Sequence, residues 1–471
     1  MRTNRKKHPA ALPAVLLTAW MLVGGCGWQP AVPDSEPTRG TTAAQPVDGG
    51  TAAGSATGVL PVAGSATPGN ESGTPAASAE PVSLTLWHIW GSESDSNKKP
   101  FEKALSDWKA LHPDIRIEVE ATENETYKVK LRTAIAVNEA PDIFYSWGAG
   151  FAKPFIESGK VLALDALLSE ETRGLMLPGS LDNFTFGGKV YGLPTFRIAG
   201  IFYCNTELFD RYGLTIPDTF TELLDAVSVF RSNGITPMAL GAKDGWPAIF
   251  YQNVLAIRTA GIAKCQAALR REASFDDPDF VASADMLRQL VDAGAFDEAC
   301  IQTTQYEADR QFISGRIPMY FSGSWFAGTL EQQVSSVTGK VRVRNFPSVD
   351  GAHGDQNGYV GGTIDSFMFS AATRHPREAV DAMIDISRRF CAEGYLSGSC
   401  IPAWQVDVDA SRVSPLSRDI VTLLGSHDGY VLAWDTMLAG LSARTHINLV
   451  TDVIAGRRTP AEFARDMQQL E

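Results

Sequence analysis

A strict alternation of strand and helix patterns between residues 82 and 145 constrains the fold more than any other feature of the sequence. Apolar and polar residues take turns over short runs, as in half-buried strands, and the runs are separated by stretches with apolar residues at helical spacing. The predicted elements are, in order, a strand at 82–87, a helix at 101–111, a strand at 115–120, a helix at 125–137 and a strand at 142–145. This order predicts an α/β protein built on a doubly wound sheet with flanking helices.

The rest of the chain is rich in helix signals. Asp277-Pro278 is typical of a helix start, and Thr459-Pro460-Ala461-Glu462 is a capping box. Further strand patterns occur at 317–321, 341–346 and 366–370. The stretch from about residue 83 to residue 471 is longer than one hydrophobic core usually covers, so two domains are expected.

The N-terminus has the pattern of an export signal. Four cationic side chains within the first seven residues precede an apolar run from Ala10 to Val23, which is typical of a secretory signal rather than an anchor helix. The run ends in Leu22-Val23-Gly24-Gly25-Cys26, which resembles the bacterial lipobox, where the signal is cut before a cysteine that receives lipid. We therefore predict a lipoprotein signal peptide at 1–25 and lipidation of Cys26, with ordinary cleavage beside an incidental cysteine as the alternative.

Residues 26–82 are expected to form a lipid-anchored, disordered linker. Of the 56 positions from 27 to 82, 40 are Gly, Ala, Pro, Ser or Thr. Such a composition cannot bury enough apolar surface to offset the conformational entropy that ordering would remove. The segment is therefore interpreted as a tether that holds the folded part near a membrane.

The five cysteines that follow the predicted anchor are interpreted in an oxidising, exported context. Cys391 and Cys400 flank a loop that contains glycines, and Cys265 and Cys300 bracket one helical segment. We expect the disulfides Cys391–Cys400 and Cys265–Cys300, although the sequence leaves all three pairings of these four open. Cys204, in an apolar strand, is expected to be a buried free thiol. No spacing of Cys and His suggests a metal site.

Charge and motifs argue against several function classes. A formal charge of -13 disfavours nucleic acid and anionic membrane surfaces as partners. The sequence contains no G-x-S-x-G, H-E-x-x-H or P-loop motif, and its seven histidines are scattered singly. We therefore expect no enzyme and no cofactor. A secreted glycoside hydrolase stays as an alternative, because the spacing of its carboxylate pair would be spatial rather than sequential.

Tryptophans in predicted loops are the clearest functional signal. Ligands of a doubly wound sheet lie beyond the carboxyl ends of the strands, where Trp90 and Trp147 follow the first and third strands. An indole has a flat apolar face that can cover a pyranose ring. Trp108 lies instead on the apolar face of its helix and is predicted to be core. The tryptophans beside Gly, Pro or polar residues, which we predict to contact a sugar-like ligand, are Trp90, Trp147, Trp246, Trp325, Trp404 and Trp434.

From about residue 83 the order of segments resembles the extracellular solute-binding proteins of bacterial carbohydrate ABC importers, the maltose-binding-protein-like family. The similar segments are LTLWHIW, HPDIRIEVE, APDIFYSW, ESGKVLALDALL, GGKVYGLPTF, GIFYCNTELFDRYGL, FISGRIPMYFSGSW, YVGGTIDSFMFSAATRHPREAVDAM and IAGRRTPAEFARDMQQ. The resemblance implies a two-lobed periplasmic-binding-protein-like fold, with a doubly wound sheet and flanking helices in each lobe and a hinge between the lobes. It implies lobe 1 at 83–194 plus 316–372 and lobe 2 at 195–315 plus 373–471.

The resemblance also suggests site residues. In the family an aromatic residue of the SGSW segment stacks on a sugar, which points to Trp325. The loop after the first strand points to Glu93, the segment after the first crossing between lobes points to Arg197, and Asp365 follows a pair of glycines that permit close backbone approach. The late-helix aromatic of maltose-binding protein has no counterpart in this sequence, and Trp434 is the expected substitute.

The function implied is that of an extracytoplasmic receptor, attached to the cell membrane through its lipid anchor only. It would bind a carbohydrate, in the first place an oligosaccharide, in a cleft between the lobes. It would act as a monomer and deliver the ligand to the permease subunits of an ABC transporter. Another solute, such as a glycerophosphodiester, a peptide or a polyamine, is the alternative ligand, and the sequence leaves open whether the protein also signals to a membrane receptor.

Overall fold

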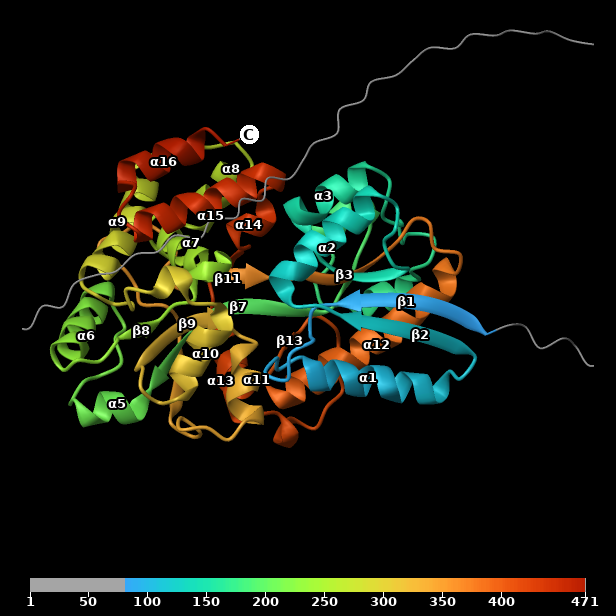
Figure 1. Cartoon of the computed structure of the whole chain (residues 1–471), viewed down its shortest axis with the longest axis horizontal. Helices are drawn as coiled ribbons and strands as arrows, with labels where there is room; N and C mark the ends of the chain where they lie inside the picture. Colours follow the sequence, from blue (N-terminus) through green and yellow to red (C-terminus); the bar gives the residue numbers. More distant parts are fainter. Residues whose placement is uncertain (1–80, 471) are drawn as a thin grey trace, which may run out of the picture. The chain divides into compact units, whose positions relative to one another are not determined.

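The computed structural model describes residues 81–470 (Figure 1). The predicted signal peptide, Cys26 and nearly all of the predicted linker lie outside the described residues. The described part of the chain contains two large sheets, each with its own hydrophobic core and its own helices. Both sheets contribute residues to the cavity described below.

The first sheet has the strand order β2-β1-β3-β12-β6. Its strands are β1 (Val82–His88), β2 (Ile115–Ala121), β3 (Ile143–Trp147), β6 (Leu193–Pro194) and β12 (Asp365–Phe369). β1 pairs in parallel with β2 and β3, whereas β12 pairs antiparallel with β3 and β6. The helices α1 (Lys98–Leu111) and α2 (Asn124–Ala136) connect the parallel strands. The predicted β-α-β-α-β order is therefore confirmed, and Trp108 is core, with 2% of its surface exposed.

Further elements complete the surroundings of this sheet. They are α3 (Ala149–Glu157), α4 (Glu170–Gly174), the 3-10 helix η1 (Asp182–Phe184), the hairpin β4 (Thr185–Phe186) and β5 (Lys189–Val190), and α12 (Pro376–Ser397). α12 packs along α1, and both helices bury their apolar faces in the core of the first sheet.

The second sheet has the order β14-β11-β7-β9-β8, with β10 and β13 also paired to β7. Its strands are β7 (Phe196–Asn205), β8 (Met238–Ala239), β9 (Met319–Gly323), β10 (Val341–Arg344), β11 (Tyr359–Gly362), β13 (Ile401–Pro402) and β14 (Tyr430–Val431). β7 is the longest of these strands and has β9, β10, β11 and β13 as antiparallel partners along its length. It therefore organises the whole second sheet.

Most of the helices belong with this second sheet. They are α5 (Thr206–Arg211), α6 (Phe220–Ser232), α7 (Trp246–Ala260), α8 (Ile262–Leu269), α9 (Pro278–Asp292), α10 (Gln305–Ile313), α11 (Phe326–Gln332), α13 (Pro415–Leu424), α14 (Trp434–Met437), α15 (Gly440–Ile454) and α16 (Pro460–Gln468). Three 3-10 helices accompany them, η2 (Ala242–Asp244), η3 (Cys300–Gln302) and η4 (Ala410–Arg412).

The division of the chain between the sheets differs from the predicted lobe boundaries. Residues 316–372 were expected in lobe 1, but β9, β10 and β11 all lie in the sheet of β7. Conversely, α12 was expected in lobe 2, yet its apolar face packs in the core of the first sheet. The reason is the long antiparallel ladder of β7, which recruits three strands from this stretch and leaves only β12 to the first sheet.

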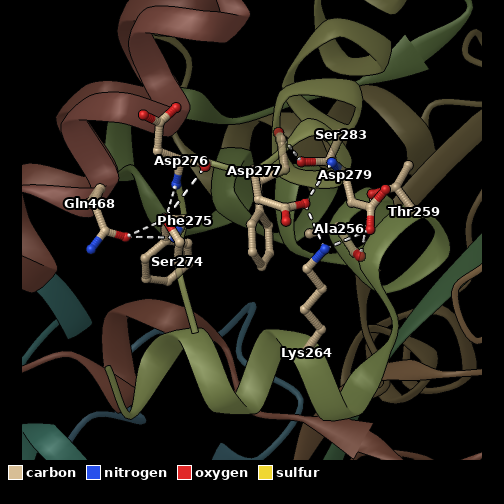
Figure 2. Close-up of polar contacts among 11 residues, drawn as sticks. Ala256, Thr259, Lys264, Ser274, Phe275, Asp276, Asp277, Asp279, Ser283 and Gln468 are labelled. Atoms are coloured by element: carbon tan, nitrogen blue, oxygen red, sulfur yellow. Dashed lines mark hydrogen bonds and ion pairs between the residues drawn. The ribbon is translucent and has the colours of Figure 1, made fainter. Parts of the chain in front are cut away.

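The start of α9 shows how a predicted helix start is built (Figure 2). The carboxylate of Asp277 accepts a hydrogen bond from the backbone N–H of Asp279 at 2.9 Å, and Pro278 occupies the first helical position. Lys264 of α8 donates to Asp277 at 2.6 Å and to Asp279 at 2.8 Å, which joins α8 to the start of α9. The predicted capping box at Thr459 is also present, at the start of α16.

Neither predicted disulfide is present in the structure, in which the five described cysteines are buried free thiols. Cys265 lies on α8 and Cys300 in η3, and these elements pack against different neighbours, so the two thiols do not meet. Cys400 does lie beside Cys391, but its thiol donates to the carbonyl oxygen of Cys391 at 3.2 Å. The prediction for Cys204, a fully buried free thiol in β7, is confirmed.

Candidate ligand-binding cavity

A cavity of about 460 Å³ is lined by elements of both sheets. On one side are the ends of β1 and β3 with α2, and on the other are η2 and the helices α7, α10, α14 and α15. β1 and β3 are parallel, so their carboxyl ends open at the same edge of the sheet, which is where a doubly wound sheet binds its ligands. The cavity is thus at the edge that the strand pattern predicts.

Four of the six predicted tryptophans line this cavity: Trp90, Trp147, Trp246 and Trp325. The rings of Trp246 and Trp325 have centroids 5.6 Å apart at an interplanar angle of 58°. Both indoles are only partly buried, so they present surface to the cavity. Trp90, in contrast, is 2% exposed, since its ring packs among the aromatic side chains of the first core.

The other two predicted tryptophans lie outside the cavity. Trp404 is completely buried, and its indole N–H donates to the carbonyl oxygen of Pro194 at 2.7 Å. Trp434 is also completely buried, and its ring packs against Phe275 and Phe280. Both indoles fill cores, although their neighbours in sequence are polar or small. The structure therefore places them as packing residues rather than as part of the cavity wall.

Glu93 and Arg197 also lie outside the cavity. Glu93 is exposed and forms an ion pair with Lys98 at the start of α1, which lowers the pKa of its carboxyl group. Arg197 donates through its guanidinium to the carbonyl oxygen of Pro178 at 2.8 Å. Each side chain is engaged with a protein group away from the predicted site.

Asp365 does line the cavity. The hydroxyl of Tyr145 donates to its Oδ1 atom. Burial raises the pKa of this carboxyl group to about 7. Asp365 is thus a carboxyl group in the cavity wall that gains or loses its charge near neutral pH.

Further charged residues line the cavity and were not predicted: Asp95, Glu125, Lys128, Arg132, Lys243, Asp244, Asp309, Asp435 and Arg444. Asp309 accepts from the hydroxyl of Tyr320 at 2.8 Å and from the amide of Gln305 at 3.0 Å. Burial raises the pKa of Asp309 to about 7 and that of Asp95 to about 6. A ligand in this cavity therefore meets several buried or half-buried acceptors.

Two of the four cationic residues that line the cavity, Lys128 and Arg132, lie on α2. Lys128 donates to Glu125 at 2.7 Å, and its ammonium group lies 5.1 Å from the ring centroid of Trp147. Arg132 lies over the ring of Phe151 at 4.7 Å. In the sequence these residues follow one another at helical spacing with acidic neighbours, which is typical of a solvated helix face. Only the position of α2 beside β1 and β3 makes this face part of a site.

Residues 81–470 contain no group of three or more His, Cys, Asp or Glu side chains arranged to hold a metal ion. None of the helices in that range combines the length and apolarity that crossing a bilayer requires. The chemistry of the cavity is that of an aromatic wall with hydrogen-bonding groups around it, and this combination can bind and orient a polar ligand with apolar faces.

Two α/β lobes that share one aromatic and polar cavity define a class of solute-binding proteins. Residues 91–384 match the model of the family described as bacterial extracellular solute-binding protein, and this chain belongs to that family. The predicted two-lobed fold is thereby confirmed.

Similar proteins of known structure or name agree with this assignment. The melibiose/raffinose/stachyose-binding protein MelE of Bacillus subtilis is 22% identical over 345 residues, which are 71% of this chain and 77% of MelE. A structure from work on xylan utilization by the thermophilic bacterium Caldanaerobius polysaccharolyticus is 40% identical, with a TM-score of 0.80, and the match covers 82% of this chain and 99% of that one. A chitin oligosaccharide binding protein is 27% identical, with a TM-score of 0.76, over 83% of this chain and 98% of its own.

Proposed function

We propose that this protein binds a carbohydrate, specifically an oligosaccharide, in the cavity and delivers it to the permease subunits of an ABC importer. The observation that carries this proposal is the pair of indoles, Trp246 and Trp325, at the cavity wall with carboxylates nearby. Two of the similar proteins described above are named for oligosaccharides that they bind, and a third comes from work on the use of a polysaccharide. The protein acts as a monomer, held at the outer face of the cell membrane by lipid on Cys26.

The physical argument follows from the two kinds of surface on a sugar. A pyranose ring has faces made of C–H groups, which gain apolar contact with an indole, and an edge of hydroxyl groups, which need hydrogen-bond partners. In the cavity, Trp246 and Trp325 supply apolar surface for the C–H faces of the sugar, and Asp365 and its neighbours supply hydrogen-bond partners for its hydroxyl groups. A ligand without flat apolar faces would leave the indoles uncovered, so a sugar fits better than a polyamine or a glycerophosphodiester.

The direct test is a calorimetric panel with the purified protein. It includes xylo-, chito-, malto- and raffinose-type oligosaccharides, and a glycerophosphodiester, a peptide and a polyamine as the other ligand classes. We expect saturable binding of at least one oligosaccharide class and none of the other three. Absence of binding across all the oligosaccharides would contradict the proposal, and release of reducing ends from a polysaccharide would assign the protein to the hydrolases instead.

The affinity for the sugar should depend on pH through Asp365. A sugar hydroxyl that donates to the ionised carboxylate stabilises it, so the bound ligand lowers the pKa of Asp365 from its value of about 7 in the free protein. The proton then competes with the ligand, and affinity falls as the pH is lowered from 8 through 7 to 6. Each pKa unit of this shift corresponds to about tenfold in affinity.

Calorimetry at several pH values checks this prediction, with Asp365→Asn as the comparison. The amide retains an oxygen that can accept from Tyr145 but does not titrate, so the pH dependence due to this position should disappear. Asp309 and Asp95 titrate in a similar range and remain in both proteins, so the difference between the two pH profiles isolates Asp365. Identical profiles for the two proteins would show that Asp365 does not contact the ligand.

A further inference from the structure

We infer that Gly323, the last residue of β9, is a positioning residue for the ligand-stacking surface, because the space left by its missing side chain is where the indole of Trp325 lies. This inference rests on the proposed function, since it concerns how the stacking indole is held. Gly323 is not among the residues that line the cavity, so its effect on a ligand would pass through Trp325.

Gly323 belongs to a pair of glycines that leaves one face of the second sheet without side chains at this point. In the antiparallel ladder of β7 and β9, Gly323 is directly opposite Gly200, and directly opposed residues face the same side of a sheet. A Cβ atom at Gly323 would lie 2.0 to 2.3 Å from three atoms of the Trp325 ring. A Cβ atom at Gly200 would lie 2.7 Å from the ring of Phe321. Two aromatic rings thus lie directly on the bare backbone of this glycine pair.

The backbone itself does not require glycine at position 323. Gly323 is absent from the glycines with positive φ, so an alanine can adopt its conformation. This distinguishes it from Gly245 at the start of α7, whose φ of +80° favours glycine whatever surrounds it. The three atoms nearest to a side chain at Gly323 therefore all belong to the indole of Trp325, and it is this ring rather than the backbone conformation that excludes the side chain.

The main chain on both sides of the indole is held in place by hydroxyl groups. Tyr203 donates to the carbonyl oxygen of Gly323 at 3.0 Å, and Ser96 donates to the carbonyl oxygen of Trp325 at 2.9 Å. A methyl group added at Gly323 therefore meets a fixed backbone and a movable ring. The indole has to turn away, and it leaves its place beside Trp246 and Phe250, whose ring centroids lie 5.6 and 6.3 Å from it.

The test is a double-mutant cycle with Gly323→Ala and Trp325→Ala, using an oligosaccharide that the wild-type protein binds. We expect Gly323→Ala to weaken binding roughly fivefold or more, as the loss of an aromatic stack does. In the Trp325→Ala protein the same change should have no further effect, because the ring it displaces is absent. Near-ultraviolet circular dichroism of the ligand-free proteins gives a second readout, since moving one of two neighbouring indoles alters the aromatic signal.

Gly91→Ala is the matched control. Gly91 follows Trp90 at the end of β1, has no positive φ, and a Cβ atom there would lie no closer than 3.4 Å to its nearest neighbour, Ala121. This variant should keep both the affinity and the aromatic spectrum of the wild-type protein.

Several outcomes would overturn the inference. One is a Gly323→Ala protein with the affinity and the aromatic spectrum of the wild-type protein. Another is a loss of sugar affinity on Gly323→Ala that is as large in the Trp325→Ala protein as in the wild-type protein. If Gly323→Ala does not fold, the double variant with Trp325→Ala tests the inference, because removal of the ring should restore folding. A double variant that also fails to fold would reject the inference. If the wild-type protein binds no oligosaccharide, the proposed function fails, whereas the dichroism comparison still tests the placement of the ring.

Discussion

Replacement of Arg258 by methionine is expected to lower the free energy of unfolding by about 4 kcal/mol, the largest effect on stability that we predict. Arg258 lies in the last turn of α7 and is completely buried. Its guanidinium donates to the carbonyl oxygens of Phe346, Pro347, Asp355 and Gly358 and to the side-chain oxygen of Asn345, at distances from 2.8 to 3.4 Å. Burial lowers the pKa of this group to about 10, so it remains charged at neutral pH.

The effect on stability is large because one side chain donates hydrogen bonds to five acceptors of the same loop. The acceptors of Arg258 all lie between β10 and β11, and methionine would leave them buried without donors, at about 1–3 kcal/mol for each unpaired group that cannot relax. Lysine keeps the charge but lacks the planar set of donors, so Arg258→Lys should be nearly as damaging.

Urea denaturation measures this prediction. Arg270→Met provides the control, because Arg270 is an exposed arginine paired with Glu272, and its loss should change little. A loss of less than about 1 kcal/mol for Arg258→Met would mean that the loop finds other donors and does not depend on the guanidinium.

The sequence predicted individual elements better than their partners. The strands and helices of residues 82–145 are local patterns, because each depends on which face of a short segment is apolar, and all five are present in the structure. The lobe boundaries failed because strand pairing is not local. β11 and β12 are separated by only Thr363 and Ile364, yet one joins the second sheet and the other the first. Nothing in a strand's own alternation states which sheet it will join.

The same distinction applies to the cavity. Trp90 and Trp147 reach it because a rule about parallel sheets places the ends of their strands together. Trp434 was predicted from its neighbours in sequence, but its ring is surrounded by Phe275 and Phe280 from a distant part of the chain. Asp309 was missed for the opposite reason, since a polar residue on a helix is usually solvated. Its burial becomes visible only when α10 is placed beside β9 and the cavity.

Removal of the indole at position 325 should weaken binding of the sugar by about 1–3 kcal/mol and leave the fold intact. Trp325 is only partly buried, and the ring contributes to the cavity wall together with Trp246. The hydrogen bonds that fix its neighbourhood are made by main-chain carbonyls, which alanine retains. Trp325→Ala should therefore weaken binding of the ligand, which loses an apolar surface to contact, more than it lowers the stability of the fold.

Calorimetric titration of Trp325→Ala beside Trp87→Ala separates these two effects. Trp87 on β1 is also partly buried, but it packs beneath the ammonium group of Lys130 and does not line the cavity, so its loss should leave the affinity unchanged. Trp246→Ala should resemble Trp325→Ala, and the double variant should lose less than the sum of the two, because rings in contact act on the same ligand surface. Wild-type affinity in Trp325→Ala would contradict this prediction and place the sugar against another wall of the cavity. Trp147 would then be the candidate for stacking, because it is more accessible than Trp90, whose ring is covered by the core of the first sheet.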